Sequence, residues 1–431
     1  MRNVLLFLVC LALTIGMVTA ANADTDVADK AAQILLGKTL YNDTSLSKFG
    51  NQSCATCHNP AGSFVDDRNP DSAVIAAGWP ASIAPPVSQG SDLTLFGGRN
   101  TPSAAYAAFS PSFHFNEVDG LYVGGQFLDG RELSLAGQAA GPFRNPVEMA
   151  MEDKKAVVRL LKWNANYRKL FAAAYKTEDG PYNLWFVSTL INQHVLETYD
   201  LMAKAIGEFE KTQEFNKFNS KYDYYLAYDE PLTAKEERGR RLFNNKGMCA
   251  LCHISEPAFA PDGGMMPPLL TDFTYNNLGI PKNEVIDNLL GEPQPADRGL
   301  GLVLNDTAQD GKFKVMSLRN IELTAPYGHN GFFPTLESIV RFYNTAGILN
   351  CETVGGTPVT PADLANGDLP ELDNNYCWPD AEFTDTLNRG ELGDLGLTAA
   401  QELKIVAFLK TLTDRGDMAS TFVAGRFPPM P

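Results

Sequence analysis

Two Cys-x-x-Cys-His motifs constrain this chain more than any other feature of its sequence. The first is Cys54-Ala55-Thr56-Cys57-His58 and the second is Cys249-Ala250-Leu251-Cys252-His253. In such motifs both thiols bond covalently to the vinyl groups of a haem, and the adjacent histidine ligates the iron. A zinc site would need further Cys or His ligands, and none lies within about 50 residues of either motif. We therefore expect two covalent c-type haems, held by Cys54, Cys57, Cys249 and Cys252, with His58 and His253 as iron ligands.

A weak internal repeat precedes the two motifs. The segments are Gly37-Lys38-Thr39-Leu40-Tyr41-Asn42 and Gly239-Arg240-Arg241-Leu242-Phe243-Asn244. The repeat predicts two related domains with one haem each. We place the N-terminal domain at residues 24–215 and the C-terminal domain at residues 216–431.

Helix signals dominate the rest of the sequence. Thr233-Ala234-Lys235-Glu236 and Thr398-Ala399-Ala400-Gln401 are capping boxes that open helices. Apolar residues recur at helical spacing over residues 186–209. Strand patterns are sparse, and long loops rich in Gly and Pro cover residues 59–100 and 256–268. We predict a mostly α fold of two cytochrome c-like helical domains, with long loops wrapping the haems.

The N-terminal residues predict export. An apolar run over residues 4–18 is followed by Ala21-Asn22-Ala23, which indicates a secretory signal peptide over residues 1–23, cleaved after Ala23. The run is too short for a membrane-spanning helix. We expect a periplasmic protein, and attachment to the cell surface stays open as an alternative.

Charge and the remaining cysteines add two expectations. The formal net charge is −16, which argues against nucleic acid and anionic membranes as partners and favours a partner with a basic face. Cys351 and Cys377 lie outside both haem motifs, in one Gly/Pro/Asp-rich segment. In an oxidising compartment we expect them to form a disulfide that closes this insertion.

Several longer motifs resemble those of the bacterial di-haem cytochrome c peroxidases and MauG-like enzymes. They are Arg99-Asn100-Thr101-Pro102, Gln126-Phe127-Leu128-Asp129-Gly130-Arg131, the run from Gln138 to Met149, Ser317-Leu318-Arg319-Asn320 and the run from Leu323 to Gly331. The resemblance extends from Ala32 to Thr413. It implies that the haem of His58 reacts with hydrogen peroxide.

The resemblance also implies roles for individual residues near that haem. Glu148 matches the acid/base carboxylate that assists cleavage of the O–O bond. Gln138 and Pro142 match positions that provide a hydrogen bond and shape the cavity. No histidine lies between His58 and Asn100, so we expect the first haem to keep an open axial position.

Five further positions concern the second haem and the gap between the haems. Tyr343 stands where the peroxidases have an axial Met and MauG-like enzymes have Tyr, so we expect it to ligate the second iron. Asn100, Thr324 and Pro326 match the ligands of a calcium ion between the domains, and their oxygens suit calcium. Leu128 stands where the family usually has a Trp that relays oxidising equivalents, which leaves transfer between the haems unsettled.

The resemblance therefore predicts a MauG-like enzyme. Peroxide would oxidise the haem pair to a high-valent state that oxidises a Trp or Tyr of a partner protein. One alternative is a cytochrome c peroxidase that takes electrons from a small cytochrome. A second is a non-catalytic di-haem electron carrier.

Overall fold

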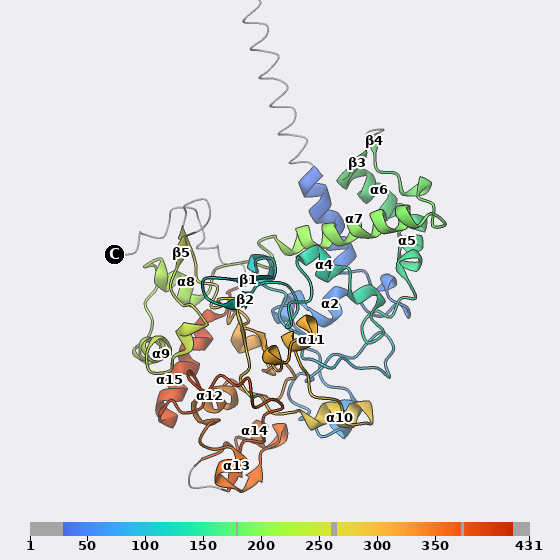
Figure 1. The fold of residues 1–431 in the computed structure, drawn as a ribbon. Helices are drawn as coiled ribbons and strands as arrows, with labels where there is room; N and C mark the ends of the chain where they lie inside the picture. The colour runs from blue at the N-terminus through green and yellow to red at the C-terminus, as the bar shows by residue number, and fades with distance from the viewer. Residues whose placement is uncertain (1–28, 178–179, 260–264, 372–374, 417–431) are drawn as a thin grey trace, which may run out of the picture.

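The computed structural model describes residues 29–177, 180–259, 265–371 and 375–416, and these residues are mostly helical (Figure 1). The predicted signal peptide lies outside the described residues. A first helix covers residues 29–41. The labelled α-helices are α2 (Cys54–Cys57), α3 (Ser72–Ala76), α4 (Leu135–Ala139), α5 (Lys154–Trp163), α6 (Ala165–Ala174), α7 (Asn192–Glu210), α8 (Lys221–Leu226), α9 (Ala234–Asn244), α10 (Glu284–Leu290), α11 (Leu300–Leu304), α12 (Leu336–Thr345), α13 (Cys351–Val354), α14 (Pro361–Asn366) and α15 (Ala399–Leu409).

The strands are short and form two-stranded sheets. Four pairs are antiparallel: β1 (His114–Asn116) with β2 (Leu121–Val123), β3 (Lys176–Thr177) with β4 (Gly180–Pro181), β5 (Ala258–Phe259) with β6 (Met265–Met266), and β7 (Tyr275–Asn276) with β8 (Phe313–Lys314). The pair β9 (Thr357–Pro358) and β10 (Tyr376–Cys377) is parallel. The predicted mostly α fold is therefore confirmed.

The internal repeat corresponds to two helix crossings of the same geometry. A Cβ atom added to Gly37 would lie 2.6 Å from the carbonyl carbon of Ala205 and 3.0 Å from Cβ of Phe209 on α7. A Cβ atom added to Gly239 would lie 2.6 Å from the carbonyl carbon of Lys404 and 3.0 Å from Cβ of Phe408 on α15. In both halves the glycine has no Cβ atom, so the backbone of the helix before a haem motif can contact the backbone of a later helix.

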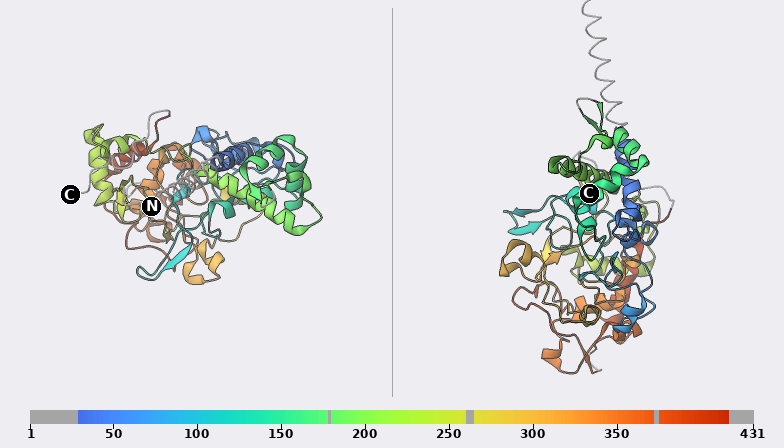
Figure 2. Two further views of the ribbon diagram at one scale, coloured as in Figure 1. Left: turned by 90° about the horizontal axis from the view of Figure 1, so that it is seen from above. Right: turned by 90° about the vertical axis from the view of Figure 1, so that its right-hand side faces the viewer.

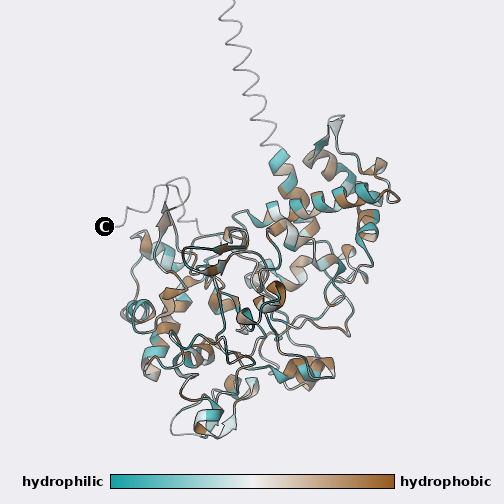
Figure 3. Cartoon of the chain, in the orientation of Figure 1, coloured by the Kyte–Doolittle hydropathy of each residue, from teal (hydrophilic) through white to brown (hydrophobic). Residues whose placement is uncertain are grey.

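Two large hydrophobic clusters divide the helices. One contains buried residues from Leu36 to Phe218, and the other contains buried residues from Tyr222 to Leu412. Figure 1 shows α4 to α7 at the upper right and α8, α9, α12 and α15 at the left, and the view from above in Figure 2 separates the same groups. Figure 3 shows hydrophobic and hydrophilic residues interleaved along these helices, as expected for helices with one buried face.

Contacts between residues far apart in the chain tie the two groups together. A third cluster packs Trp79 and its neighbours against Val285 and Ile286 of α10. Arg99 forms ion pairs of 2.6 Å with both Asp129 and Asp297. The loop after the first haem motif is therefore fixed against the second half of the chain.

Local predictions have mixed outcomes. The capping boxes at Thr233 and Thr398 are confirmed, as is the Cys351–Cys377 disulfide. The helix predicted over residues 186–209 was wrong at its start, because α7 begins at Asn192. Residues Leu184–Phe186 form a separate 3-10 turn, and the Asn183 side chain accepts a hydrogen bond from its backbone. This turn ends before α7 begins.

In the described part of the chain, no helix combines the length and the apolar character that a membrane span requires.

Candidate functional site: two haem cavities

The first Cys-x-x-Cys-His motif has the geometry that an iron ligand needs. Its cysteines lie at the two ends of α2, and His58 follows directly. Nδ1 of His58 lies 3.1 Å from the carbonyl oxygen of Phe64, so an Nδ1–H donates to that oxygen. This bond orients the ring and leaves Nε2 free to bind iron. Burial lowers the pKa of His58, which favours the neutral ring that metal binding requires.

The second motif repeats this arrangement. Cys249 opens a 3-10 turn, Cys249–Leu251, and Cys252 and His253 follow it. Nδ1 of His253 lies 2.9 Å from the carbonyl oxygen of Leu270, and burial lowers the pKa of this histidine as well. In each half, two thiols and one oriented imidazole face a cavity, and this set of donor atoms fits a covalent haem c.

The first cavity has a volume of about 890 Å³, within the usual range of ligand pockets. Its wall contains Cys54, Cys57 and His58 of the haem motif. It also contains the three residues predicted to act on peroxide, which are Gln138, Pro142 and Glu148. Residues separated by some 80 positions or more in sequence therefore share one cavity, although their roles stay predictions.

Glu148 has the electrostatic environment of a proton-transfer group. Burial raises the pKa of its carboxyl, and the nearby Arg131 opposes this rise. Arg131 is itself held by Asp129 at 2.8 Å and lies over the ring of Phe127. The raised pKa makes Glu148 a stronger proton acceptor than an exposed carboxylate, as a proton-transfer group requires.

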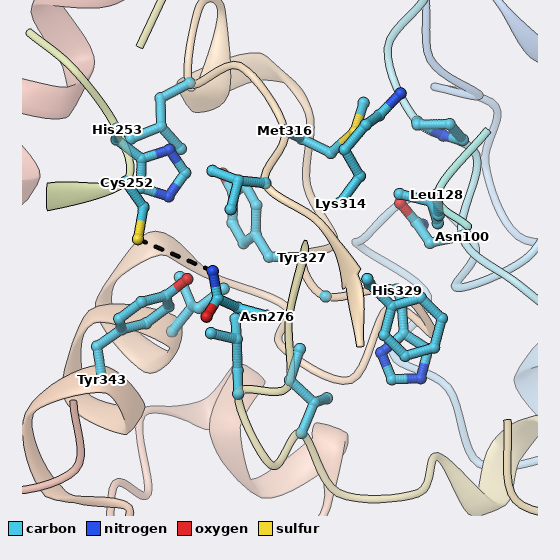
Figure 4. Close-up of a pocket in the computed structure, with 18 of the residues that line it drawn as sticks. Asn100, Leu128, Cys252, His253, Asn276, Lys314, Met316, Tyr327, His329 and Tyr343 are labelled. Atoms are coloured by element: carbon cyan, nitrogen blue, oxygen red, sulfur yellow. Dashed lines mark hydrogen bonds between the residues drawn. The ribbon is translucent and has the colours of Figure 1, made fainter. Parts of the chain in front are cut away.

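The second cavity is smaller, about 240 Å³. Figure 4 shows the rings of His253 and Tyr343 entering it from different sides, with Asn276 beside the phenol group. Tyr343 lies on α12, and burial raises the pKa of its phenol. The structure therefore brings the predicted second ligand of this haem into the same cavity as His253.

Twelve residues line both cavities, and Leu128, Lys314, Met316 and His329 are among them. Leu128 is buried, and its carbonyl oxygen accepts a hydrogen bond of 2.8 Å from the backbone N–H of Lys314. The predicted location of Leu128 between the haem sites agrees with this geometry. Among aromatic residues nearby, Phe127 lines the first cavity, whereas Trp79 belongs to the third cluster.

Lys314 is a functional candidate that the sequence did not identify, whereas His329 belongs to the motif from Leu323 to Gly331 and had no role assigned. The Lys314 Nζ donates to the carbonyl oxygen of Gly125 at 2.6 Å, and burial lowers the pKa of this amine to about 8. His329 stacks on Phe313 with ring centroids 3.8 Å apart, on the side of the second cavity away from Tyr343 (Figure 4). The available signal for Lys314 was a lysine among apolar residues, just before the Ser317-Leu318-Arg319-Asn320 motif.

The three residues predicted to bind calcium also meet. Asn100, Thr324 and Pro326 all line the second cavity. Nδ2 of Asn100 donates to the carbonyl oxygen of Pro86 at 3.0 Å, which leaves Oδ1 as an oxygen ligand. The arrangement is compatible with calcium, and the ion itself stays a prediction.

Comparisons with known proteins agree with this geometry. The sequence profile of the family described as di-haem cytochrome c peroxidase matches residues 31–231. The methylamine utilization protein MauG of Paracoccus denitrificans is 36% identical over 95% of this chain and 96% of its own length. The crystal structure of the diheme peroxidase BthA from Burkholderia thailandensis is 27% identical, with a TM-score of 0.67 over 92% of this chain and 86% of its own. A MauG-like protein associated with microbial copper homeostasis is 26% identical, with a TM-score of 0.59 over 92% of each chain. The chain therefore belongs to the di-haem cytochrome c peroxidase family that includes MauG, and it is a MauG-like, peroxide-dependent haem oxidoreductase with two c haems.

Proposed function

We propose that this enzyme uses hydrogen peroxide to oxidise an aromatic residue, Trp or Tyr, of a partner protein. The observation that carries the proposal is the position of Tyr343, whose phenol enters the cavity of His253. A phenolate is a hard anionic ligand that favours oxidised iron, whereas a thioether favours reduced iron. A haem ligated in this way suits storage of an oxidising equivalent better than entry of electrons.

The chain's own residues would divide the work between the cavities. Each bound haem supplies an iron that exchanges electrons with peroxide or with a partner. His58 and His253 would hold the irons through Nε2, and the phenol oxygen of Tyr343 would be a further protein ligand at the second haem. Burial raises the pKa of the Tyr343 phenol, and a bound metal cation would favour its deprotonated form.

In the first cavity, Glu148 would carry the proton. Its carboxylate would take a proton from one peroxide oxygen and return it to the other, which would leave as water. Gln138 would orient the peroxide by a hydrogen bond, and Pro142 would limit the space beside it. We further propose that a calcium ion at Asn100, Thr324 and Pro326 links the two halves.

A second candidate is supported by charge. The net charge of −16 favours a small basic cytochrome as electron donor, as a cytochrome c peroxidase would require. In either case we propose that the protein acts in the periplasm, after removal of residues 1–23.

The deciding experiment mixes the holoenzyme, hydrogen peroxide and a reduced basic cytochrome c. We expect slow oxidation of the cytochrome by the wild type and faster oxidation by Tyr343→Met, which restores a thioether ligand. Rapid turnover by the wild type would defeat the proposal in favour of a cytochrome c peroxidase. Electron paramagnetic resonance of the ferric enzyme should show one high-spin and one low-spin haem, and two low-spin signals would contradict the open site at His58.

A further inference from the structure

A buried acid on α7 has no role in the chemistry described above. Glu210 is the last residue of α7, and it lines the first cavity together with Cys54 and Tyr41. Glu210 is only 6% exposed, and its Oε2 has no hydrogen-bond partner among the described residues. Burial without a hydrogen bond destabilises the charged form of a carboxyl group unless another group in the cavity compensates for the charge.

The groups around Glu210 do not supply that compensation. Tyr41, Cys54 and Glu214 interact electrostatically with it or with its immediate neighbours, and none of them is a cation. The lysines on the adjacent segments bind other acids: Lys38 pairs with Glu214, and both Lys30 and Lys211 pair with Glu208. Burial accordingly raises the pKa of Glu210 to about 8.

The internal repeat shows that the fold does not need an acid at this position. Phe209 and Phe408 occupy equivalent places at the two helix crossings, so the residue equivalent to Glu210 is Leu409. Leu409 is buried in the second cluster. The partner residues also correspond, because Tyr41 packs edge-on against Phe209 at 5.5 Å and Phe243 packs edge-on against Phe408 at 5.3 Å.

We propose that Glu210 takes up a proton when the haem attached at Cys54 and Cys57 gains an electron, and releases it when that electron leaves. One electron passes from the reductant to the iron, and one proton passes from bulk solvent to a carboxylate oxygen of Glu210. The physical reason is charge balance in a poorly solvated site. The carboxylate stabilises the more positive oxidised haem, and reduction removes that positive charge and so favours the neutral acid.

The proposal makes the two haems respond differently to pH. The reduction potential of the first haem should fall as pH rises, because reduction there consumes a proton. The second haem has Leu409 and Phe243 at the equivalent positions, so this mechanism gives it no such dependence.

The test is an anaerobic redox titration of the holoenzyme between about pH 5 and pH 9, with the haems followed separately by absorbance and electron paramagnetic resonance. In the wild type we expect the potential of one haem to depend on pH, approaching one proton per electron. Glu210→Gln and Glu210→Leu should remove that dependence. The matched control is Glu214→Gln, a nearby exposed acid paired with Lys38, and it should keep the dependence.

A second measurement keeps the proposal testable if the Glu210 variants fail to incorporate haem. The infrared difference spectrum of the wild type on reduction should contain the C=O band of a newly protonated carboxyl group, and this band should shift in Glu210→Asp. A pH-independent potential for both haems, a dependence that survives in Glu210→Gln, or the absence of the infrared band would overturn the proposal. Neither measurement uses peroxide or a partner protein, so failure here is separate from failure of the proposed function.

Discussion

Replacing Gly37 by alanine should destabilise the N-terminal half and leave the C-terminal half folded. The added Cβ would lie 2.6 Å from the carbonyl carbon of Ala205, and carbon atoms prefer a separation of about 3.5 Å, so the two helices must move apart by about 1 Å. Overpacking of this kind costs about 1–3 kcal/mol, and the shift lies at the upper end. The higher helix propensity of alanine offsets about 1 kcal/mol. We expect the free energy of unfolding to fall by about 2 kcal/mol.

The repeat supplies its own matched variant. Gly239→Ala meets Lys404 at the same distance and should destabilise the C-terminal half by a similar amount. Gly137→Ala is a control, because a Cβ there meets the end of the flexible Glu132 side chain, and it should change stability little.

Chemical denaturation of the wild-type holoprotein and the three variants measures the free energies of unfolding, and hydrogen exchange locates the change. Exchange should increase in α7 for Gly37→Ala and in α9 and α15 for Gly239→Ala. Wild-type stability in Gly37→Ala, or equal loss of protection in both halves, would refute the inference that each haem motif rests on its own helix crossing.

Three further predictions concern the sites. Glu148→Gln should slow the reaction with peroxide by about 10²–10⁴-fold. Because burial raises the pKa of Glu148, the wild-type rate should fall on acidification through a pKa above that of an ordinary glutamate. Matching pH profiles of the wild type and the variant, measured by stopped flow, would contradict this role. Replacing Cys351 and Cys377 by serine should lower the free energy of unfolding by about 3–4 kcal/mol, because the disulfide closes a loop of 26 residues and so restricts the unfolded chain. Urea denaturation measures this loss, and an unchanged midpoint would contradict the prediction. Asn100→Ala should lower the calcium content measured by atomic spectroscopy, and a wild-type protein that contains no calcium would reject the site.

The parts of the structure set by short-range chemistry could be predicted from the sequence. Capping boxes at Thr233 and Thr398 depend on residues three positions apart, and the Cys351–Cys377 pairing follows from the number of cysteines. The start of α7 could not be predicted in this way. Phe186 and Leu190 fit a helical period, yet both are exposed because a 3-10 turn ends before the helix begins.

The residues of the candidate site also differ in whether the sequence alone could predict them. The haem cysteines and histidines are contiguous in sequence, and the resemblance to a family located Glu148 and Tyr343. Lys314 and Glu210 were missed, because their significance comes from burial between segments that are distant in the chain. A buried Lys or Glu has no local signature, and only the tertiary structure shows that its charge lacks an adjacent counterion.

Comparison of the two halves of the repeat shows why the two haem sites differ chemically. Gly37 and Gly239 build the same helix crossing, so the scaffold around each haem motif is equivalent. The differences lie in side chains that the crossing does not require: the carboxyl of Glu210 faces the first cavity, whereas Leu409 takes its place in the second half. If the helix crossings set only the geometry, exchanging such residues should move the potential and the pH response of one haem without moving its helices. The chemical division of labour in this enzyme would then be separable from its fold.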